Sequence, residues 1–217
     1  MSFEPERLNA RLTGACSERL MLRAPRLGDA IDLFEASRNP HFNAHLMWAT
    51  PPDLNAVRVR MQRIIDRAEA GICAAFSAID RTSGRWAALF RFEPRAETVW
   101  AELGLWSHPE FWGAGYGEEV TRLAIEQAFT KTDLEGVVAC AQPAHRVSMR
   151  LLERCGLEPL GLEPRAHESG YDVPLMRMLM TRTRWSWLRT ESISGWMPEP
   201  FTLETLQDLR EPISLRG

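Results

Sequence analysis

Several features that would assign this 217-residue chain to a special class are scarce or missing. Its four cysteines, Cys16, Cys73, Cys140 and Cys155, show no C-x-x-C spacing, which argues against a disulfide framework and against a thiolate metal site. No apolar run approaches the ~20 residues of a membrane-spanning helix, and the first residues lack the basic and apolar pattern of a secretory leader. We therefore expect reduced thiols, a cytoplasmic location, no membrane contact and no metal.

Excess charge of one sign is also missing. The chain has 26 Lys and Arg against 29 Asp and Glu, so its net charge of -3 at pH 7 lacks the basic surplus of proteins that bind nucleic acid. With 45% hydrophobic and 25% charged residues, the composition is that of a folded globular protein. The length allows one ordinary domain and a tail. We expect no nucleic-acid partner.

Two helices are predicted in the first third of the chain. The first covers residues 28–38 and directs Leu27, Ile31 and Phe34 inward. The second begins with Thr50 as its cap, because a side-chain hydroxyl there can bond a free N–H of the first turn. Its apolar stripe follows the 3.6-residue period. The stripe contains Val57, Met61, Ile64, Ile65 and Ala68.

Short extended runs then replace the helical period. Runs at 72–80, 85–92 and 98–106 are joined by turn sequences of hairpin length, which predicts three antiparallel strands. Extended and helical segments alternate in the rest of the chain. The other predicted elements are a strand at 19–23, a helix at 118–130, a strand at 136–141, a helix at 145–154, and strands at 157–162 and 172–182.

The predicted order of elements is β-α-α-β-β-β-α-β-α-β-β. This order is typical of an α/β fold with one mixed, mostly antiparallel sheet that helices cover on both faces. We assign residues 1–18 to a loose polar lead-in, 19–185 to a single domain, and 186–217 to a C-terminal tail. The tail either packs on the domain or a dimer mate, or forms a lid over a ligand site. Its predicted short amphipathic segment contains Leu203, Leu206 and Leu209.

The segment W-G-A-G-Y-G at 112–117 lies between an extended run and a helical run. Three glycines in five residues allow a ligand to approach main-chain N–H groups without interference from Cβ atoms. The helix that follows adds its unpaired first N–H groups and the positive end of its dipole. A strand, a glycine loop and a helix in this order predict a site for phosphate or pyrophosphate.

These features resemble the GNAT superfamily of acyl-coenzyme A N-acyltransferases, and within it the RimJ/RimL-like protein N-acetyltransferases. The resemblance covers residues 17–185 and implies a GNAT-like single domain. The family's phosphate motif R/Q-x-x-G-x-G/A, opened by Trp in this subgroup, is similar to residues 112–117, which Glu119 follows. Further segments resemble the subgroup's R-L-x-L-R opening, its A-E-x-G segment, its G-x-x-D closing and two of its tryptophans. They are residues 19–23, 101–104 and 170–172, with Trp48 and Trp185.

The resemblance implies acetyl-coenzyme A as co-substrate. Its diphosphate would rest on the loop amides, and its pantetheine would pair with the strand end before the loop. His145 stands where the family has Asn, and it either replaces that Asn in cofactor binding, carries a proton, or only starts the helix. The implied cofactor-binding residues are Leu105, Trp106, Ser107, Trp112, Gly113, Ala114, Gly115, Tyr116, Gly117, His145 and Ser148.

Acyl transfer to an amine needs a base, a stabilised oxyanion and a proton for the departing thiolate. Glu102 is the predicted base, and the alternative is a strand glutamate that only faces solvent. Many family members protonate the thiolate with a Tyr, but that position is Leu152 here. Ser148 is therefore the predicted donor, unless the helix backbone occupies its hydroxyl. A main-chain N–H near Leu105 or Trp106 would hold the oxyanion.

Two departures from the family concern the charge beside the loop. Ala114 stands where Lys or Arg is common, and Glu118 stands where a small or hydroxyl residue is usual. Arginines such as Arg122, Arg146 or Arg150 then hold the diphosphate together with the main chain, or binding is weakened.

The predicted function is direct transfer of an acetyl group to a primary amine, either of a protein N-terminus or of a small molecule. Residues 42–48 and 166–171 are the predicted acceptor-contacting regions. A homodimer is the commonest assembly for such domains. Two alternatives come from other classes: a non-catalytic acyl-coenzyme A-binding module, and a cofactor-free interaction protein on the same fold.

Overall fold

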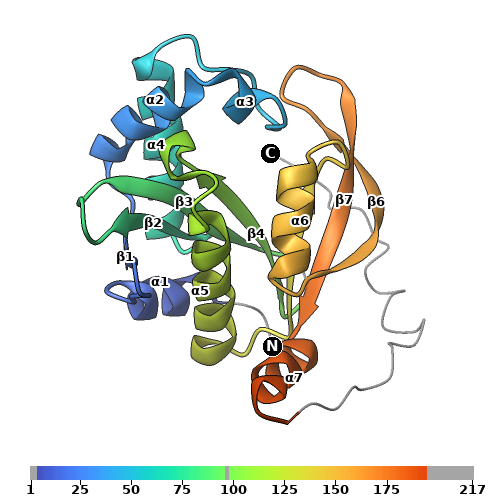
Figure 1. The fold of residues 1–217 in the computed structure, drawn as a ribbon. Coiled ribbons are helices and arrows are strands. Elements are labelled where there is room, and N and C mark those ends of the chain that lie inside the picture. Colours follow the sequence, from blue (N-terminus) through green and yellow to red (C-terminus); the bar gives the residue numbers. More distant parts are fainter. Residues whose placement is uncertain (1–3, 96–97, 195–217) are drawn as a thin grey trace.

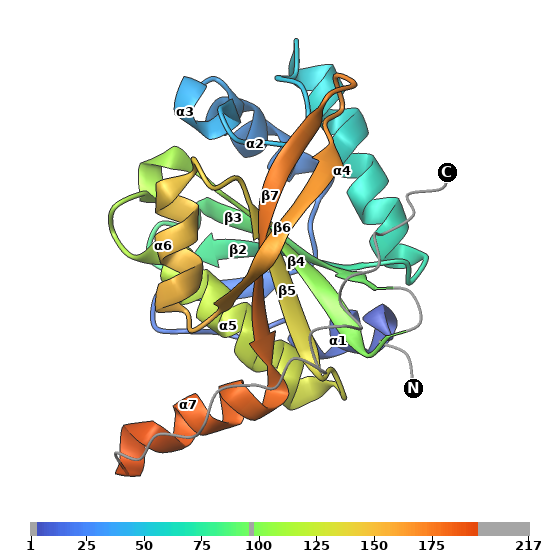
Figure 2. The same ribbon diagram turned by 90° about the vertical axis from the view of Figure 1, so that its right-hand side faces the viewer.

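The structure, a computed structural model, describes residues 4–95 and 98–194. One seven-stranded sheet runs through it, with helices on both faces (Figures 1 and 2). The strands are β1 (Leu20–Arg23), β2 (Ala74–Asp80), β3 (Trp86–Pro94), β4 (Trp100–Ser107), β5 (Gly136–Ala141), β6 (Glu158–Ala166) and β7 (Asp172–Thr181). Their order across the sheet is β1-β2-β3-β4-β5-β7-β6, and only the neighbours β4 and β5 are parallel. The predicted fold class is confirmed.

The helices form two outer layers (Figure 2). One face of the sheet carries α1 (Pro5–Leu12), α5 (Tyr116–Lys131), α6 (Arg146–Arg154) and α7 (Arg182–Ser194). The other face carries α2 (Ala30–Ser37), α3 (Pro40–Asn43) and α4 (Leu54–Glu69), and two 3-10 turns, η1 (Leu27–Asp29) and η2 (Pro109–Phe111), complete the set. Among the described residues, no helix combines the length and apolar content needed to cross a bilayer.

Strand β2 shows why the sheet needs both layers. All seven of its residues are buried, and successive side chains of a strand point to opposite faces. Phe76 and Ala78 therefore pack beneath α5, whereas Ala75 and Ile79 pack beneath α2 and α4. Burial on both faces anchors β2 and its neighbour β3 in the core, and β4, which leads to the glycine loop, pairs with β3.

The lead-in predicted at residues 1–18 contains helix α1, so our expectation of a loose segment is wrong there. Leu8 is fully buried in the core beneath α5. Asn9 donates from Nδ2 to the carbonyls of Ala68 and Cys73, 3.1 Å away in each case, and its Oδ1 accepts the N–H of Ala75 at 3.2 Å. These partners are about 60 residues distant in the chain, which is why local periodicity missed the helix.

The first predicted helix is present as η1 and α2, but its inner face is only partly the predicted one. Phe34 packs against the core as predicted, whereas Leu27 and Ile31 are exposed and Leu33 is buried instead. The cause is Asp29, which is buried between these positions and pairs with Arg23 at 2.6 Å. This ion pair fixes the direction in which the chain enters the helix. As a result, the face of α2 that contains Leu33 points towards the sheet.

The second predicted helix is α4, and its cap is Asp53 rather than Thr50. The Oδ1 atom of Asp53 accepts the N–H of Ala56 at 2.8 Å. Two consecutive prolines before Asp53 favour extended backbone, which delays the start of the helix. The predicted stripe is correct: Val57, Met61 and Ile64 are buried, and Ile65 and Ala68 pack against the same core.

Three boundaries also differ from the prediction. Helix α5 begins at Tyr116 instead of residue 118, and α7 runs through the predicted boundary between residues 185 and 186. Strand β6 continues past Pro164 to Ala166, which is possible because β6 is an edge strand and its proline need not donate to a neighbour. The predicted amphipathic segment at Leu203, Leu206 and Leu209 lies outside the described residues.

Candidate active site

Strands β4 and β5 separate part of the way along the sheet. Their pairing covers only four residues and ends at Leu103 with Ala139. Beyond that point β4 stays paired with β3 as far as Ser107, and β5 stays paired with β7 as far as Ala141. One edge of β4 over residues 104–107 therefore has no strand partner, and its main-chain groups face the gap.

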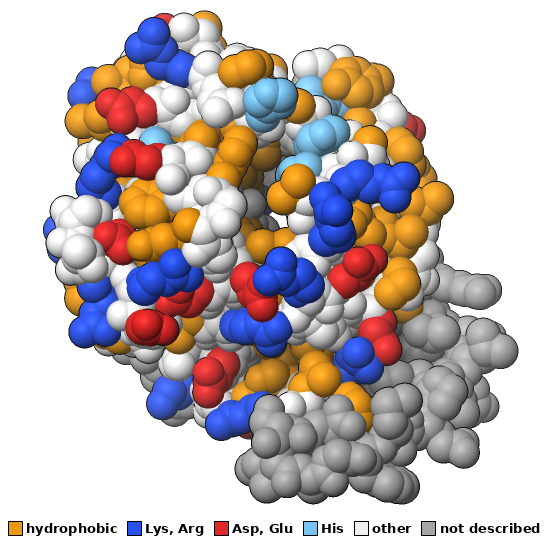
Figure 3. Space-filling view, viewed as in Figure 1, with side chains coloured by type: hydrophobic (Ala, Val, Ile, Leu, Met, Phe, Trp, Pro, Cys, Tyr) orange, Lys and Arg blue, Asp and Glu red, His pale blue; other side chains and the backbone are white. Residues whose placement is uncertain are grey.

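The gap opens into a cleft of about 1080 Å³, which is the hollow near the centre of Figure 3. The cleft is bounded by the ends of β4 and β5, the glycine loop, the start of α6 and the segment that follows α3. Most of the predicted cofactor residues meet there. They are Leu105, Trp106, Ser107, Trp112, Gly113, Gly115, Gly117, His145 and Ser148.

The glycine loop forms a backbone cradle at one end of the cleft. Gly113 and Gly115 have φ angles of 75° and 82°, a region that side chains with a Cβ atom adopt only at a cost. None of the amides from Gly113 to Gly117 donates a hydrogen bond to another described residue. Several N–H groups at the positive end of α5 are therefore available to an anion.

Arg19 holds the loop from the side of β1. Its Nη1 donates to the carbonyl of Ala114 at 2.8 Å, and its guanidinium pairs with Glu119 at 2.6 Å. The same guanidinium lies 4.1 Å from the ring centre of Tyr116, whose hydroxyl donates to Asp80 at 2.8 Å. Ala114 and Tyr116, two of the predicted cofactor-binding residues, do not line the cleft.

Trp112 ties the loop to the end of β4. Its indole Nε1 donates to the Ser107 hydroxyl at 3.0 Å and to the Ser107 carbonyl at 3.1 Å. Gly117 has a separate role, because a Cβ atom there would lie 2.8 Å from Cδ1 of Leu151. The third glycine of the motif thus permits close packing of α5 on α6.

The negative charge at Glu118 is matched by two arginines. Its carboxylate pairs with Arg122 at 3.0 Å and with Arg154 at 2.6 Å. Arg146 and Arg150 also line the cleft. The charge that made the loop unusual in sequence is therefore compensated by neighbours on α5 and α6.

Glu102 lies outside the cleft lining and has a partner of its own. Arg165 on β6 donates from Nη1 to Oε1 at 2.5 Å and from Nη2 to Oε2 at 3.0 Å. Burial lowers the pKa of Arg165, but its hydrogen bond and its attraction to Glu102 outweigh burial and raise the pKa above its usual value. The base role of Glu102 stays a prediction.

Cys140 lines the cleft beside this ion pair, but its thiol is inert. Burial and the negative charge of Glu102 raise the pKa of Cys140 to about 12. The thiolate fraction at pH 7 is then on the order of 10⁻⁵, so the form that attacks a thioester is almost absent. This observation favours direct transfer over a covalent acyl-cysteine route.

Helix α6 starts at the cleft and brings two predicted residues into it. Ser148 lines the cleft, and its hydroxyl donates to no described residue. The helix backbone therefore does not occupy this hydroxyl. His145 precedes the first residue of α6 but makes no side-chain capping bond.

Next to Trp106, contacts outside the cleft lining join two segments that the sequence did not connect. The ring centres of Trp48 and Trp106 are 5.0 Å apart, and Arg60 lies 4.9 Å from the ring centre of Trp48. Arg60 pairs with Glu168 at 3.1 Å, and a Glu168 oxygen accepts the N–H of Ala49 at 2.7 Å. These contacts bring together the two predicted acceptor regions, 42–48 and 166–171. No local signal marked Arg60 or Glu168, because they are 108 residues apart in the chain.

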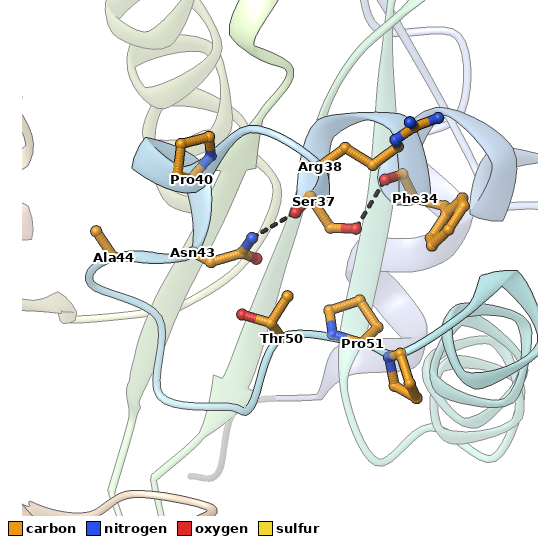
Figure 4. A pocket seen from close by; sticks show the side chains of 9 residues that line it. Phe34, Ser37, Arg38, Pro40, Asn43, Ala44, Thr50 and Pro51 are labelled. Carbon is orange, nitrogen blue, oxygen red and sulfur yellow. Dashed lines mark hydrogen bonds between the residues drawn. The ribbon is translucent and has the colours of Figure 1, made fainter.

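A separate hollow of about 790 Å³ is lined by residues of α2, α3 and the segment before α4 (Figure 4). The Asn43 amide donates to the Ser37 carbonyl, and the Ser37 hydroxyl donates to the Phe34 carbonyl at 2.7 Å, whereas Oδ1 of Asn43 is buried without a partner among the described residues. Arg38 is the one charged side chain among the described residues that line it. Across the described ranges, no group of three His, Cys, Asp or Glu side chains is arranged to hold a metal ion.

The fold and the cleft define a class of protein: an opened sheet beside a glycine cradle accepts a long ligand that carries phosphate. Residues 19–158 match the acetyltransferase (GNAT) domain family. The chain therefore belongs to the GNAT acetyltransferase family and is an acetyl-coenzyme A-dependent acyltransferase, with acetyl-coenzyme A as co-substrate.

Individual proteins agree with this assignment. The chain is 26% identical to an uncharacterized N-acetyltransferase, p20, of Bacillus licheniformis, over 67% of this chain and 83% of that protein. Its fold is similar to Mycobacterium smegmatis RimJ, solved with CoA-disulfide, at a TM-score of 0.64, 17% identity, and coverage of 78% and 89%. It is also similar to spermidine N-acetyltransferase from Vibrio cholerae, solved with CoA and spermine, at a TM-score of 0.66, 16% identity, and coverage of 78% and 99%.

Proposed function

We propose that the protein is an N-acetyltransferase that moves an acetyl group from acetyl-coenzyme A to a primary amine by direct attack. The observation that carries this proposal is the gap between β4 and β5, which ends at a cradle of unpaired amides. The residues present fit the ligand. Open glycines leave room for a diphosphate, and the free edge of β4 can pair with the amides of a pantetheine arm.

Main-chain groups and one hydroxyl then supply the chemistry. An N–H at Leu105 or Trp106 stabilises the oxyanion that forms when the amine attacks the thioester carbonyl. The carbon–sulfur bond breaks, and the departing thiolate takes a proton from the Ser148 hydroxyl. No covalent enzyme intermediate is needed, since Cys140 is held as a neutral thiol.

The charge of the cleft favours an acceptor with a single positive charge. Among the described lining residues the one carboxylate is Glu118, and two arginines already pair with it. A polyamine would bring further positive charges next to Arg146 and Arg150 without an anionic partner. The α-amino group of a peptide or a small monoamine fits better.

A turnover assay with a matched panel of amines tests this function. Release of coenzyme A thiol is measured with an N-terminal peptide, the same peptide with a blocked α-amino group, a monoamine and spermidine. We expect turnover with the free peptide or the monoamine and little with spermidine. Tight coenzyme A binding without any turnover would instead favour the non-catalytic binding module, and absence of binding would favour the cofactor-free interaction protein.

A further inference from the structure

An acceptor amine is an ammonium ion at neutral pH and must lose a proton before it can attack. We propose that His145, stacked on His45 at the mouth of the cleft, is the group that takes this proton. The inference rests on the proposed acetyl transfer and adds the base to it.

The two imidazoles join the two sides of the cleft. His145 directly precedes α6, and His45 lies in the segment after α3. Their ring centres are 4.4 Å apart with an interplanar angle of 20°, and both residues line the cleft. Figure 3 shows histidine side chains gathered along the upper rim of the hollow.

Neither ring is committed to another hydrogen bond within the described chain. The His145 side chain does not cap α6, and Nδ1 of His45 is buried without a partner. A histidine that only started the helix would use its ring to cap the first turn or would point to solvent. A free imidazole nitrogen at the cleft can instead receive a proton from a bound ammonium group.

The surroundings keep His145 neutral. Burial, followed by repulsion from His45, lowers the pKa of His145 below its ordinary value near 6.5. His145 is therefore unprotonated and able to accept a proton at pH 7. Other groups that line the cleft from the neighbouring elements do not contribute to this shift. They are His41, Cys140, Arg146, Arg150, Arg154 and the arginine-paired Glu118.

The other candidates for the base are occupied. Glu102 lies outside the cleft lining and accepts two bonds from Arg165. Glu118 is held by Arg122 and Arg154. This leaves the histidines of the cleft. Of these, His41 is exposed, whereas His45 and His145 form the stacked pair.

The protons balance across the whole reaction. The ammonium group gives one proton to His145, and the neutral amine then forms a carbon–nitrogen bond with the acetyl carbonyl carbon. As the carbon–sulfur bond breaks, the thiolate takes a proton from Ser148, and Ser148 regains one from the nitrogen of the new amide. His145 releases its proton to water, so one amide, one thiol and one proton are formed.

The pH dependence of kcat/KM provides the first test. Activity of the wild-type enzyme should fall on the acid side as pH drops through the lowered pKa of His145. His145→Ala should lower kcat by about 10²- to 10³-fold, the usual contribution of a general base, and imidazole in solution should restore part of it. His145→Asn, which restores the family residue, should bind coenzyme A normally yet stay slow.

The variant His45→Phe tests whether His45 affects the pKa of the base, His145, or only packs against it. The phenyl ring keeps the stack but removes the repulsion that lowers the pKa of His145, so the acid limb should move to higher pH. A purely structural stack would change the rate without moving this limb. The control is Leu27→Ala, which changes an exposed residue outside the cleft lining and should leave the profile unchanged.

The outcomes separate this inference from the proposed function. If wild-type protein acetylates an amine but His145→Ala keeps both its rate and its acid limb, His145 is not the base. A large loss in Glu102→Gln with none in His145→Ala would assign the base to Glu102 instead. If wild-type protein binds coenzyme A and acetylates nothing in the panel, both the function and this inference are wrong.

Discussion

Glu102 shows how a single residue's partner changes its expected role. In the sequence it is the carboxylate on the strand that leads to the glycine loop, whereas in the structure it forms a two-bond ion pair with Arg165. Arg165 also lies 3.1 Å from Glu163, which in turn lies 3.5 Å from Arg177. This chain of charges joins β4 to β6 and β7 across the face of the sheet opposite α5.

Replacing Glu102 by Gln therefore tests stability as well as catalysis. The change leaves the guanidinium of Arg165, which is 20% exposed, without its main counter-charge. We expect unfolding free energy to fall by about 1–3 kcal/mol, less than for a fully buried pair, because water partly screens the charge. Urea denaturation measures this loss. The double variant Glu102→Gln, Arg165→Met should recover part of it; an unchanged midpoint in the single variant would contradict the ion pair's structural role.

The four cysteines should differ sharply in reactivity. Cys16 is exposed, whereas burial raises the pKa of Cys155 to about 11 and, together with Glu102, that of Cys140 to about 12. At pH 8 iodoacetamide should label Cys16 first. Labelling of Cys140 and Cys155 should rise roughly tenfold per pH unit below their pKa, because the thiolate is the reactive form. Peptide mass spectrometry measures each site, and rapid labelling of Cys140 at pH 8 would reopen a covalent mechanism.

The glycine loop acts as an element whose backbone shape carries the function. Gly113 has a φ of 75°, and a Cβ atom added there would meet nothing within 4 Å; Gly84 in the β2–β3 turn matches it with a φ of 70° and the same open space. Alanine at either position should cost about 1 kcal/mol of stability through backbone strain. Only Gly113→Ala should also weaken coenzyme A binding, by about tenfold or more, since it displaces the amides that bind phosphate.

Calorimetric titration with coenzyme A compares the two variants. If both variants lose the same stability but only Gly113→Ala loses affinity for coenzyme A, the loop backbone binds the diphosphate. Equal affinities in both variants would show that the loop backbone does not hold the diphosphate.

Helix α1 is an integral element of the domain rather than a lead-in. Leu8 is fully buried, so Leu8→Ala should lower the unfolding free energy by about 2–5 kcal/mol. Leu27→Ala is the matched control: this leucine is exposed, and its loss should change stability by less than about 0.5 kcal/mol. Urea denaturation of both variants measures the difference. Equal small effects would mean that α1 does not contribute to the core.

Ligand binding should stabilise the molecule as a whole. A site that spans β4, β5, α5 and α6 exists only in the folded chain, so coenzyme A binds the native state alone. At about 100 times its Kd the ligand should add ~2.7 kcal/mol, which raises Tm by roughly 5–10 °C for a chain of this size. Thermal unfolding with and without coenzyme A measures the shift.

Dephospho-coenzyme A serves as the control in that experiment. It keeps the diphosphate and pantetheine but lacks one phosphate, so a similar shift would place the binding energy in the glycine cradle. A much smaller shift would indicate that surface arginines such as Arg146 and Arg150 supply more of it. No shift with either ligand would contradict the proposed cofactor site.

The sequence by itself determined the parts of this protein that depend on neighbours along the chain. Alternation and 3.6-residue spacing located the strands and the stripe of α4, and the spacing of three glycines identified the phosphate loop. All seven residues of the predicted strand β2 are buried, and Gly113 and Gly115 of the predicted loop have positive φ angles, as those local patterns indicate. The family assignment followed from the same motifs.

The tertiary structure decided everything that depends on distant partners. It buried Leu8, gave Arg165 to Glu102, and paired the charge of Glu118 with Arg154. It also stacked His45 on His145, which are far apart in the chain and both line the cleft. A side chain's ionisation and accessibility depend on which charges and apolar groups the fold brings near it, and one-dimensional spacing does not contain that information.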